Sequence, residues 1–198
     1  MLQANPATLL QLINKPAMKL TITTIAILLS IATVFGQSAP AVSLHGIDGD
    51  SLQIGQYQGK KIIIVMLPVG NSLVESEWLT AIESSYQQYK DSVTIVGIPS
   101  YEDGYNDSLI PALKNWYRNT LHLNFFITMG MYTHNSSGAQ QHQLLQWLTT
   151  EKQNGHFGTG INTWGQKFVL DKTGQLRAVF DSDTPLDETL MRFIIAAS

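Results

Sequence analysis

The sequence predicts an α/β domain in which helices flank a mixed β-sheet. The first indication is two apolar runs rich in β-branched residues, 62–67 and 93–98, which are typical of central strands covered on both faces. The second is helical spacing of apolar residues between the two runs, which makes a strand–helix–strand unit and therefore a parallel pair. The third is a hairpin pattern at each end of the domain, which adds antiparallel strands.

The first 36 residues have the pattern of a secretory signal peptide. Two lysines precede an uncharged, largely apolar run over residues 20–36. This run is shorter than the roughly 20 residues that cross a bilayer, so we expect cleavage near Gly36 and export of residues 37–198, to the periplasm or the exterior if the host is bacterial. The alternative is an uncleaved membrane anchor made by residues 20–36. Met18 is a second possible start.

Composition argues against several functional classes. A chain of 198 residues with 44% hydrophobic content can bury a core of one domain. Without residues 1–36, 10 basic residues stand against 15 acidic ones, so no basic patch is available for nucleic acid. The chain has no cysteine, which excludes disulfides and thiol catalysis.

A β-hairpin opens the predicted domain. The sequence DGD at 48–50 favours a tight turn between two short alternating segments. The first buried strand follows and ends near Leu67. Apolar residues then recur at helical spacing over 74–90, which predicts a helix with one buried face before the strand 93–98.

The second half of the domain alternates helices and strands. Apolar spacing predicts a helix over 108–119, a strand over 124–129 and a helix over 139–151. Residues 166–180 contain a strand, a glycine turn and a returning strand. Thr184, followed by a proline and two acidic residues, predicts the start of the last helix.

Several segments together resemble the glutathione peroxidase family of the thioredoxin-like superfamily. They are IDGDSLQIGQYQGKKIIIV, YQQYKD before VTIVGIP, QLLQWL and QKFVLDKTGQL, and the similarity spans about residues 41–195. Their order and spacing carry the resemblance. It implies a thioredoxin-like fold with a mixed central sheet flanked by helices. It also implies the family activity, reduction of hydroperoxides with a thiol donor in the response to oxidative stress.

The positions by which that family works are changed in this chain. The family uses a cysteine or selenocysteine after the central strand, assisted by Gln, Trp and Asn. The resemblance places the nucleophile on Asn71 or, counted back from the next helix, on Gly70. It places the Gln on Glu102 and the Trp–Asn pair on Thr163 and Trp164. Peroxide reduction needs an atom that accepts oxygen reversibly, so we expect no catalytic residue at these positions. We also expect no cofactor and no bound metal.

Ser72 could be considered as a replacement nucleophile. A catalytic serine needs a histidine that is oriented by a carboxylate, and the sequence has no recognisable motif of that kind. The segment SLVE instead predicts a capping box, in which Ser72 and Glu75 bind each other's backbone N–H groups. We therefore expect Ser72 to begin a helix.

Two groups of residues were considered as metal ligands. His134 and His142 could bind a transition metal, and Glu102, Asp103 and Asp107 could bind calcium. Neither group has a spacing that specifies a site. We expect all five to be solvated loop residues.

The sequence thus predicts an exported, glutathione-peroxidase-like protein that has lost peroxidatic chemistry and acts as a binding or structural module. Its partner would be an unidentified protein or small molecule, and Trp164 is the aromatic residue best placed to line a groove. The alternative is a peroxidase-family oxidoreductase that acts in oxidative-stress defence by a non-thiol route. Membrane contact is expected only through an uncleaved N-terminal segment.

Overall fold

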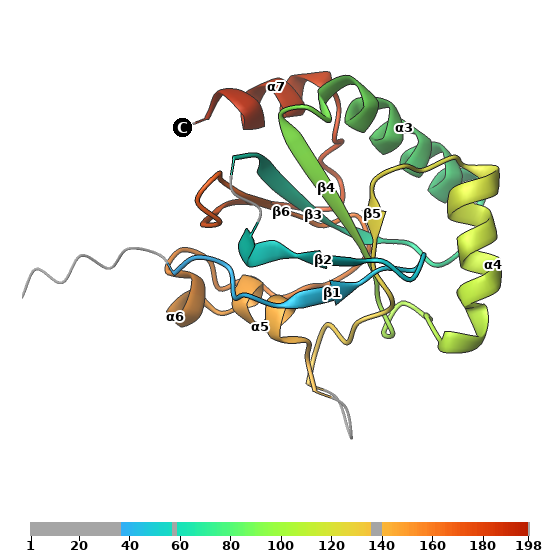
Figure 1. The fold of residues 1–198 in the computed structure, drawn as a ribbon, viewed down its shortest axis with the longest axis horizontal. Coiled ribbons are helices and arrows are strands. Elements are labelled where there is room, and N and C mark those ends of the chain that lie inside the picture. Colours follow the sequence, from blue (N-terminus) through green and yellow to red (C-terminus); the bar gives the residue numbers. More distant parts are fainter. Residues whose placement is uncertain (1–36, 57–58, 136–139, 198) are drawn as a thin grey trace, which may run out of the picture. The chain divides into compact units, whose positions relative to one another are not determined.

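The computed structural model describes residues 37–56, 59–135 and 140–197, and elements are labelled as in Figure 1. The predicted signal peptide therefore lies outside the described residues. In these ranges no helix is both long enough and apolar enough to cross a bilayer. The strands are β1 (Ser43–His45), β2 (Ser51–Gln53), β3 (Lys61–Leu67), β4 (Val93–Pro99), β5 (Phe126–Ile127), β6 (Lys167–Leu170) and β7 (Leu176–Phe180). The α-helices are α3 (Leu73–Tyr89), α4 (Ile110–Lys114), α5 (Gln143–Thr149), α6 (Glu151–Asn154) and α7 (Glu188–Ala196).

The central sheet is mixed, as the sequence predicts. Its five strands run in the order β5-β4-β3-β6-β7. Strand β3 is parallel to β4 and antiparallel to β6, and β4 is parallel to β5. The predicted leading hairpin forms a separate two-stranded sheet of β1 and β2, which contacts the strand β5 through a bridge between Gly46 and Thr128.

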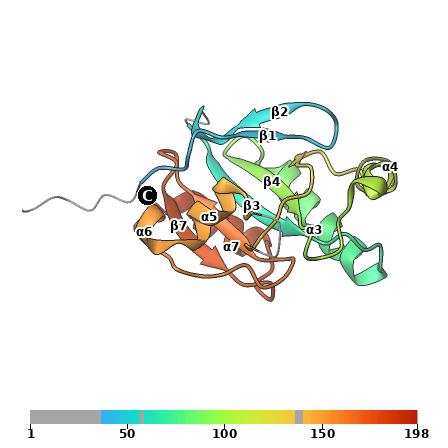
Figure 2. The ribbon, with the colours of Figure 1, turned by 90° about the horizontal axis from the view of Figure 1, so that it is seen from below.

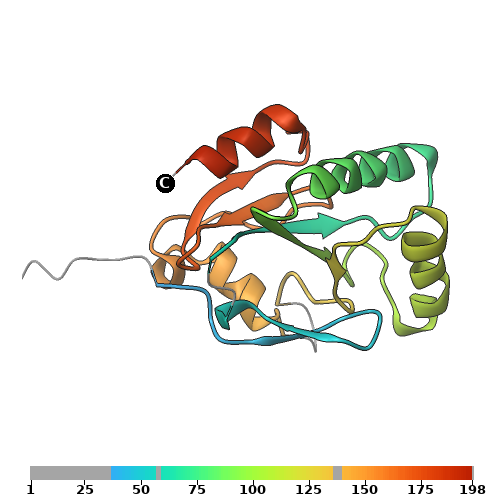
Figure 3. The same ribbon diagram turned by 45° about the horizontal axis from the view of Figure 1, so that its top comes forward.

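Helices cover both faces of the sheet. Figure 1 shows α3 and α7 along one face and the β1–β2 hairpin with α5 and α6 along the other, and Figure 3 shows the same layers from a second direction. Figure 2 shows α4 beside the N-terminal end of α3, far from α5 and α6. Alternate residues of β3 enter two separate hydrophobic clusters, so this strand is buried on both sides.

Three predicted elements differ in extent from the structure. The strand expected over 124–129 is observed only as β5, and an isolated bridge between Thr128 and Gly46 follows it. The helix expected over 108–119 is a 3₁₀ turn, α4 and a π-helical segment in succession. The helix expected over 139–151 is observed from Gln143, and residue 139 lies outside the described residues.

The prediction that Thr184 begins the last helix is wrong. Helix α7 begins at Glu188, and Asp187 is its N-cap, with its side-chain oxygen accepting a hydrogen bond from the backbone N–H of Leu190 at 2.9 Å. Thr184 instead closes a turn by donating its N–H to the carbonyl oxygen of Asp181 at 3.2 Å. Both residues are good N-cap types, and the burial of the intervening Leu186 selects the second.

Asn154 holds together the segment that leads towards β6. Its side chain is fully buried and donates to the carbonyl oxygens of Trp147, Leu148 and Phe157 at 2.8 to 3.2 Å. Its side-chain oxygen accepts from the backbone N–H groups of His156 and Phe157 at 2.8 Å. The amide side chain of Asn154 thus provides hydrogen-bond partners for five backbone groups on either side of α6.

We predict that Asn154→Ala lowers the free energy of unfolding by about 3 kcal/mol, because several buried backbone groups lose their only side-chain partner. Urea denaturation measures the change. Asn119→Ala is the control, since Asn119 is exposed and its side chain donates only to Asn115. The control should cost less than about 0.5 kcal/mol. Equal losses in both variants would contradict this role of Asn154.

Candidate functional site

The loop over residues 68–72 connects the end of β3 to the start of α3. In sheets with parallel strands, binding sites gather at the carboxyl ends of the strands, and this loop lies there. The hydroxyl of the buried Tyr117 donates to the carbonyl oxygen of Pro68 at 2.6 Å and fixes the start of the loop. Gly70 is half-buried and Asn71 is exposed, so the two positions matched to the family nucleophile lie at the surface.

The predicted capping box at Ser72 is confirmed. The N–H of Ser72 donates to a carboxylate oxygen of Glu75 at 2.8 Å, and the N–H of Glu75 donates to the hydroxyl oxygen of Ser72 at 3.3 Å. A Cβ atom placed on Gly70 would lie 2.6 Å from the same carboxylate. The N-terminus of α3 favours an anion, and the carboxylate of Glu75 supplies that anion over the loop.

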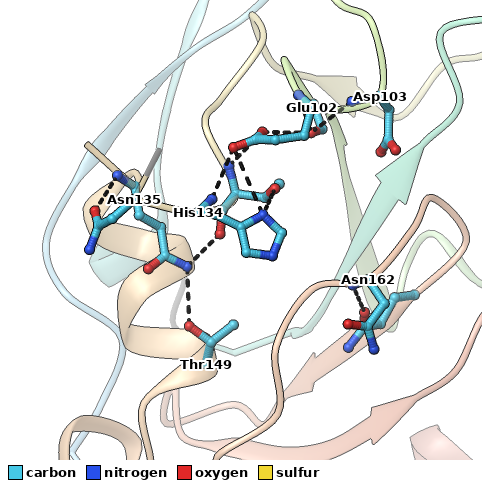
Figure 4. A network of polar contacts seen from close by, with 10 residues as sticks. Glu102, Asp103, His134, Asn135, Thr149 and Asn162 are labelled. Atoms are coloured by element: carbon cyan, nitrogen blue, oxygen red, sulfur yellow. Dashed lines mark hydrogen bonds and ion pairs between the residues drawn. The ribbon is translucent and has the colours of Figure 1, made fainter. Parts of the chain in front are cut away.

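Glu102 follows β4 at the same end of the sheet, but its carboxylate serves a different loop. It accepts hydrogen bonds from the backbone N–H groups of Thr133 and His134 at 2.9 and 3.1 Å and from the hydroxyl of Ser100 at 3.0 Å (Figure 4). Burial opposes ionisation, but these hydrogen bonds outweigh it and hold the pKa of Glu102 below its ordinary value. Glu102 is therefore an anion that anchors the loop after β5.

Trp164 and Thr163 are brought to the end of β3 by backbone contacts. The N–H of Gly165 donates to the carbonyl oxygen of Met66 at 2.8 Å, and the N–H of Met66 donates to that of Gln166 at 3.0 Å. Trp164 is half-buried and packs edge-to-face against Trp78 of α3, with ring centroids 5.3 Å apart. The predicted positions thus share one end of the sheet, where the ring of Trp164 packs against α3.

Lys167 is a residue of this region that the sequence reasoning missed. It lies on β6 opposite Val65, is fully buried, and donates to the carbonyl oxygen of Asp181 at 3.1 Å. Its ammonium group lies 5.8 Å from the centre of the Trp78 ring. Burial lowers the pKa of Lys167 to about 8, against the opposing effect of Asp181 and Asp183. A lysine that opens an apolar strand is the one signal in the sequence that could have identified it.

The candidate metal ligands have other partners. The ring of His142 accepts the N–H of Leu144 at 3.3 Å and so caps α5, and Asp107 accepts the hydroxyl of Tyr101 at 2.9 Å. Asp103 follows Glu102 in the chain, and Nδ1 of His134 lies 3.9 Å from a carboxylate oxygen of Glu102 (Figure 4). Among the described residues, no group of three or more His, Asp or Glu side chains is arranged to hold a metal ion.

Exposed apolar side chains lie on two segments at this end of the sheet. Leu73 and Val74, in the first turn of α3, are 74% and 67% exposed. Tyr132 follows β5, is 37% exposed and stacks on Tyr101 with ring centroids 4.3 Å apart. Leu73 and Val74 are neighbours, so together they form one apolar area on the first turn of α3. This end of the sheet therefore combines a capped helix terminus with an apolar surface.

The pKa of Lys167 predicts that folding stability rises between about pH 8 and pH 10. In this interval the folded protein releases the proton, whereas the unfolded chain, with an ordinary lysine pKa of 10.5, retains it. The unfolded state then binds more protons, so the free energy of unfolding increases with pH, by about 2 kcal/mol at pH 9.5 relative to pH 7. Urea denaturation of the wild type and of Lys167→Met should show that the variant lacks this rise.

The matched control for this measurement is Lys152→Met, which replaces an exposed lysine of α6. It should retain the pH dependence of the wild type. If Lys167→Met retained it as well, the buried ammonium would not be its source.

Comparisons with known proteins agree on the fold. No family model and no curated protein matches the chain. Among solved structures, Trgpx in its apo form has a TM-score of 0.57 and 20% identity over 80% of this chain and 94% of that one. A thioredoxin-family thiol:disulfide interchange protein from Chlorobium tepidum TLS has a TM-score of 0.57 and 20% identity, covering 81% and 94%. T. cruzi GPX1 has a TM-score of 0.55 and 14% identity, covering 80% and 97%.

These likenesses are shared between glutathione-peroxidase-like proteins and thiol–disulfide proteins, at identities that identify a fold and not an activity. They confirm the predicted fold class. The chain has a thioredoxin-like fold, with a mixed sheet between two layers of helices.

Proposed function

We propose that this chain is an exported, glutathione-peroxidase-like protein that does not perform thiol peroxidase chemistry and acts as a binding or structural module. The observation that carries the proposal is the position of the Glu75 carboxylate over the loop that precedes α3. In a thiol enzyme of this family a thiolate would use the helix N-terminus. In this chain the carboxylate of Glu75, a residue of the helix itself, interacts with that helix N-terminus.

The other family positions support the loss of peroxide chemistry. A neutral amide can donate a hydrogen bond to a developing oxyanion, whereas the ionised Glu102 only accepts, and its acceptor sites are already used by the loop at 133–134. Trp164 packs on Trp78, and Thr163 cannot replace an indole. Together with the absence of cysteine from the sequence, these changes leave no group that could be oxidised and reduced in a cycle.

The surface around the loop supports a binding role. Leu73 and Val74 occupy the first turn of α3, and both are largely exposed. A solvent-exposed helix turn usually carries polar residues at such positions. Their exposure costs solvation free energy unless another molecule covers them. A partner with an apolar surface would recover that free energy without any chemistry at the loop.

We predict that the wild-type protein does not turn over hydrogen peroxide or a lipid hydroperoxide with glutathione or thioredoxin as donor. Asn71→Cys should give a thiol with a somewhat lowered pKa, because the helix N-terminus favours the thiolate, but only slow turnover. Removing the competing carboxylate in Asn71→Cys/Glu75→Gln should lower the thiol pKa further. The readouts are donor oxidation per protein and the pH dependence of thiol alkylation.

Asn119→Cys is the control for this series, since it places a thiol at an exposed position away from any helix N-terminus. Its alkylation should follow an ordinary cysteine pKa. Sustained donor oxidation by the wild type would support the non-thiol peroxidase instead. Rapid multiple turnover by Asn71→Cys would show that the surrounding site is still intact.

Export is tested separately. If residues 1–36 are a signal peptide, N-terminal sequencing of the protein accumulated by cells should find a start near Gln37, in an exported fraction. An intact N-terminus at Met1 or Met18 in the membrane fraction would support the anchor made by residues 20–36. The same N-terminus in the soluble cytosolic fraction would rule out export.

A further inference from the structure

A cavity of about 370 Å³ lies between α7 and the outer strands of the sheet. Its volume falls within the range of about 300–1,000 Å³ that is usual for small-molecule sites. Apolar side chains from two directions make most of its wall, with Val169, Ala178 and Phe180 on the strands and Phe193, Ile194 and Ala197 on or next to α7. Phe193 is 63% exposed, although it belongs to a helix that otherwise buries large apolar residues in the core.

A β-bulge directs an arginine into this cavity. Val169 pairs with Ala178 and Leu170 pairs with Leu176, so Arg177 is an extra residue on β7. In a regular strand, Leu176 and Ala178 would point to the same face. Here Leu176 packs in the cluster beneath α5, and Ala178 packs against the cluster on the opposite face, so the bulge turns the chain and brings Arg177 to the cavity wall.

The arginine has hydrogen-bonding capacity to spare. Its Nε atom donates to a carboxylate oxygen of Asp171 at 2.6 Å. Neither of its Nη nitrogens has a hydrogen-bond partner within the described ranges, and the side chain is 44% exposed. The guanidinium group therefore has a free edge, and such an edge can bind a carboxylate with two donors.

Charge at this end of the cavity is positive in total. Lys61 and Arg177 line the cavity, and Lys172 lines an adjoining hollow together with Lys61, whereas Asp171 is the one acidic side chain among the described residues that line either space. Lys61 is already engaged, since its ammonium group donates to carbonyl oxygens in the last turn of α7. Lys172 does not line the cavity itself, so of the two cationic side chains in its wall Arg177 is the one that can bind a further anion.

We propose that the cavity between α7 and β7 binds a small molecule with an apolar body and one carboxylate, with the apolar body against Phe180 and Phe193 and the carboxylate on Arg177. The apolar wall of the cavity would bury the apolar body of the ligand, and the free edge of the Arg177 guanidinium would donate hydrogen bonds to its carboxylate. The site is separate from the loop at 68–72. It goes beyond the proposed loss of peroxide chemistry and does not depend on it.

The head-group assignment is tested with octanoate and 1-octanol, which share the apolar chain, by calorimetric titration of the protein in the form that cells accumulate. Octanoate should bind about tenfold more tightly than 1-octanol, the size expected for hydrogen bonds to a charged group. Arg177→Gln should remove that difference and leave the affinity for 1-octanol within about twofold. Arg192→Gln, which changes an exposed arginine of α7 paired with Glu188, should change neither affinity.

The position of the apolar body is tested with two further variants. Ala178→Phe should fill the cavity and weaken octanoate binding by about tenfold or more, and Phe193→Ala should weaken it about fivefold by removing the outer wall. Ala81→Phe on the exposed side of α3 is the control and should bind as the wild type does. Phe193 is largely exposed, so Phe193→Ala remains informative even if Ala178→Phe does not fold.

Three results would overturn the proposal. The first is an octanoate affinity that is the same in the wild type, Phe193→Ala and Arg177→Gln. The second is equal binding of octanoate and 1-octanol. The third is no octanoate binding together with a dimer, seen by sedimentation, that Phe193→Ala dissociates, because the face would then be an interface between copies of the chain. None of these results bears on peroxide turnover, so the two proposals fail independently.

Discussion

The burial of β3 on both faces is the constraint on which the rest of the structure depends. All its apolar side chains are inaccessible to solvent, and they alternate between the cluster under α3 and α7 and the cluster under α5. Its backbone groups are paired with β4 on one side and β6 on the other. A strand in this position cannot shift its register without exchanging the two cores, so the loop at 68–72 and the start of α3 are fixed in place.

A fixed helix start at the end of a buried strand is a place where an anion is stable, whatever its chemical identity. Thiol enzymes of thioredoxin-like fold use this property to stabilise a thiolate. In the present chain the carboxylate of Glu75 occupies the helix terminus, and Ser72 completes the cap. The helix terminus is therefore satisfied by side chains of the chain itself, which supports the proposal that the fold is present here without thiol chemistry.

The elements that depend on interactions between neighbouring residues could be predicted from the sequence. The strand β3, the helix α3 and the capping box at its start depend on neighbouring residues, and the sequence was sufficient for them. Both Thr184 and Asp187 are residue types that cap helices, and the structure uses Asp187, with the buried Leu186 before it. The burial of Lys167 and the bulge at Arg177 arise from tertiary contacts that no short segment encodes. The hydrogen bonds of Asn154 are local, within residues 147–157, but no recognised sequence motif indicates them. The Glu102 position was predicted, but its engagement with the loop at 133–134 was not.

The two regions of interest lie at opposite ends of the same strand. The loop at 68–72 follows the last residue of β3, whereas the polar end of the cavity includes Lys61, the first residue of β3. Seven residues of extended chain span about 20 Å, which separates the polar end of the cavity from the loop. The apolar end of the cavity reaches further along the sheet, because Phe180 pairs with Lys167 and Lys167 pairs with Val65. No residue of the loop at 68–72 lines the cavity, so a change of side chain in the loop alters no part of the cavity wall. A chain could therefore lose its chemistry at the loop and still keep, or acquire, a ligand at the far end of the sheet.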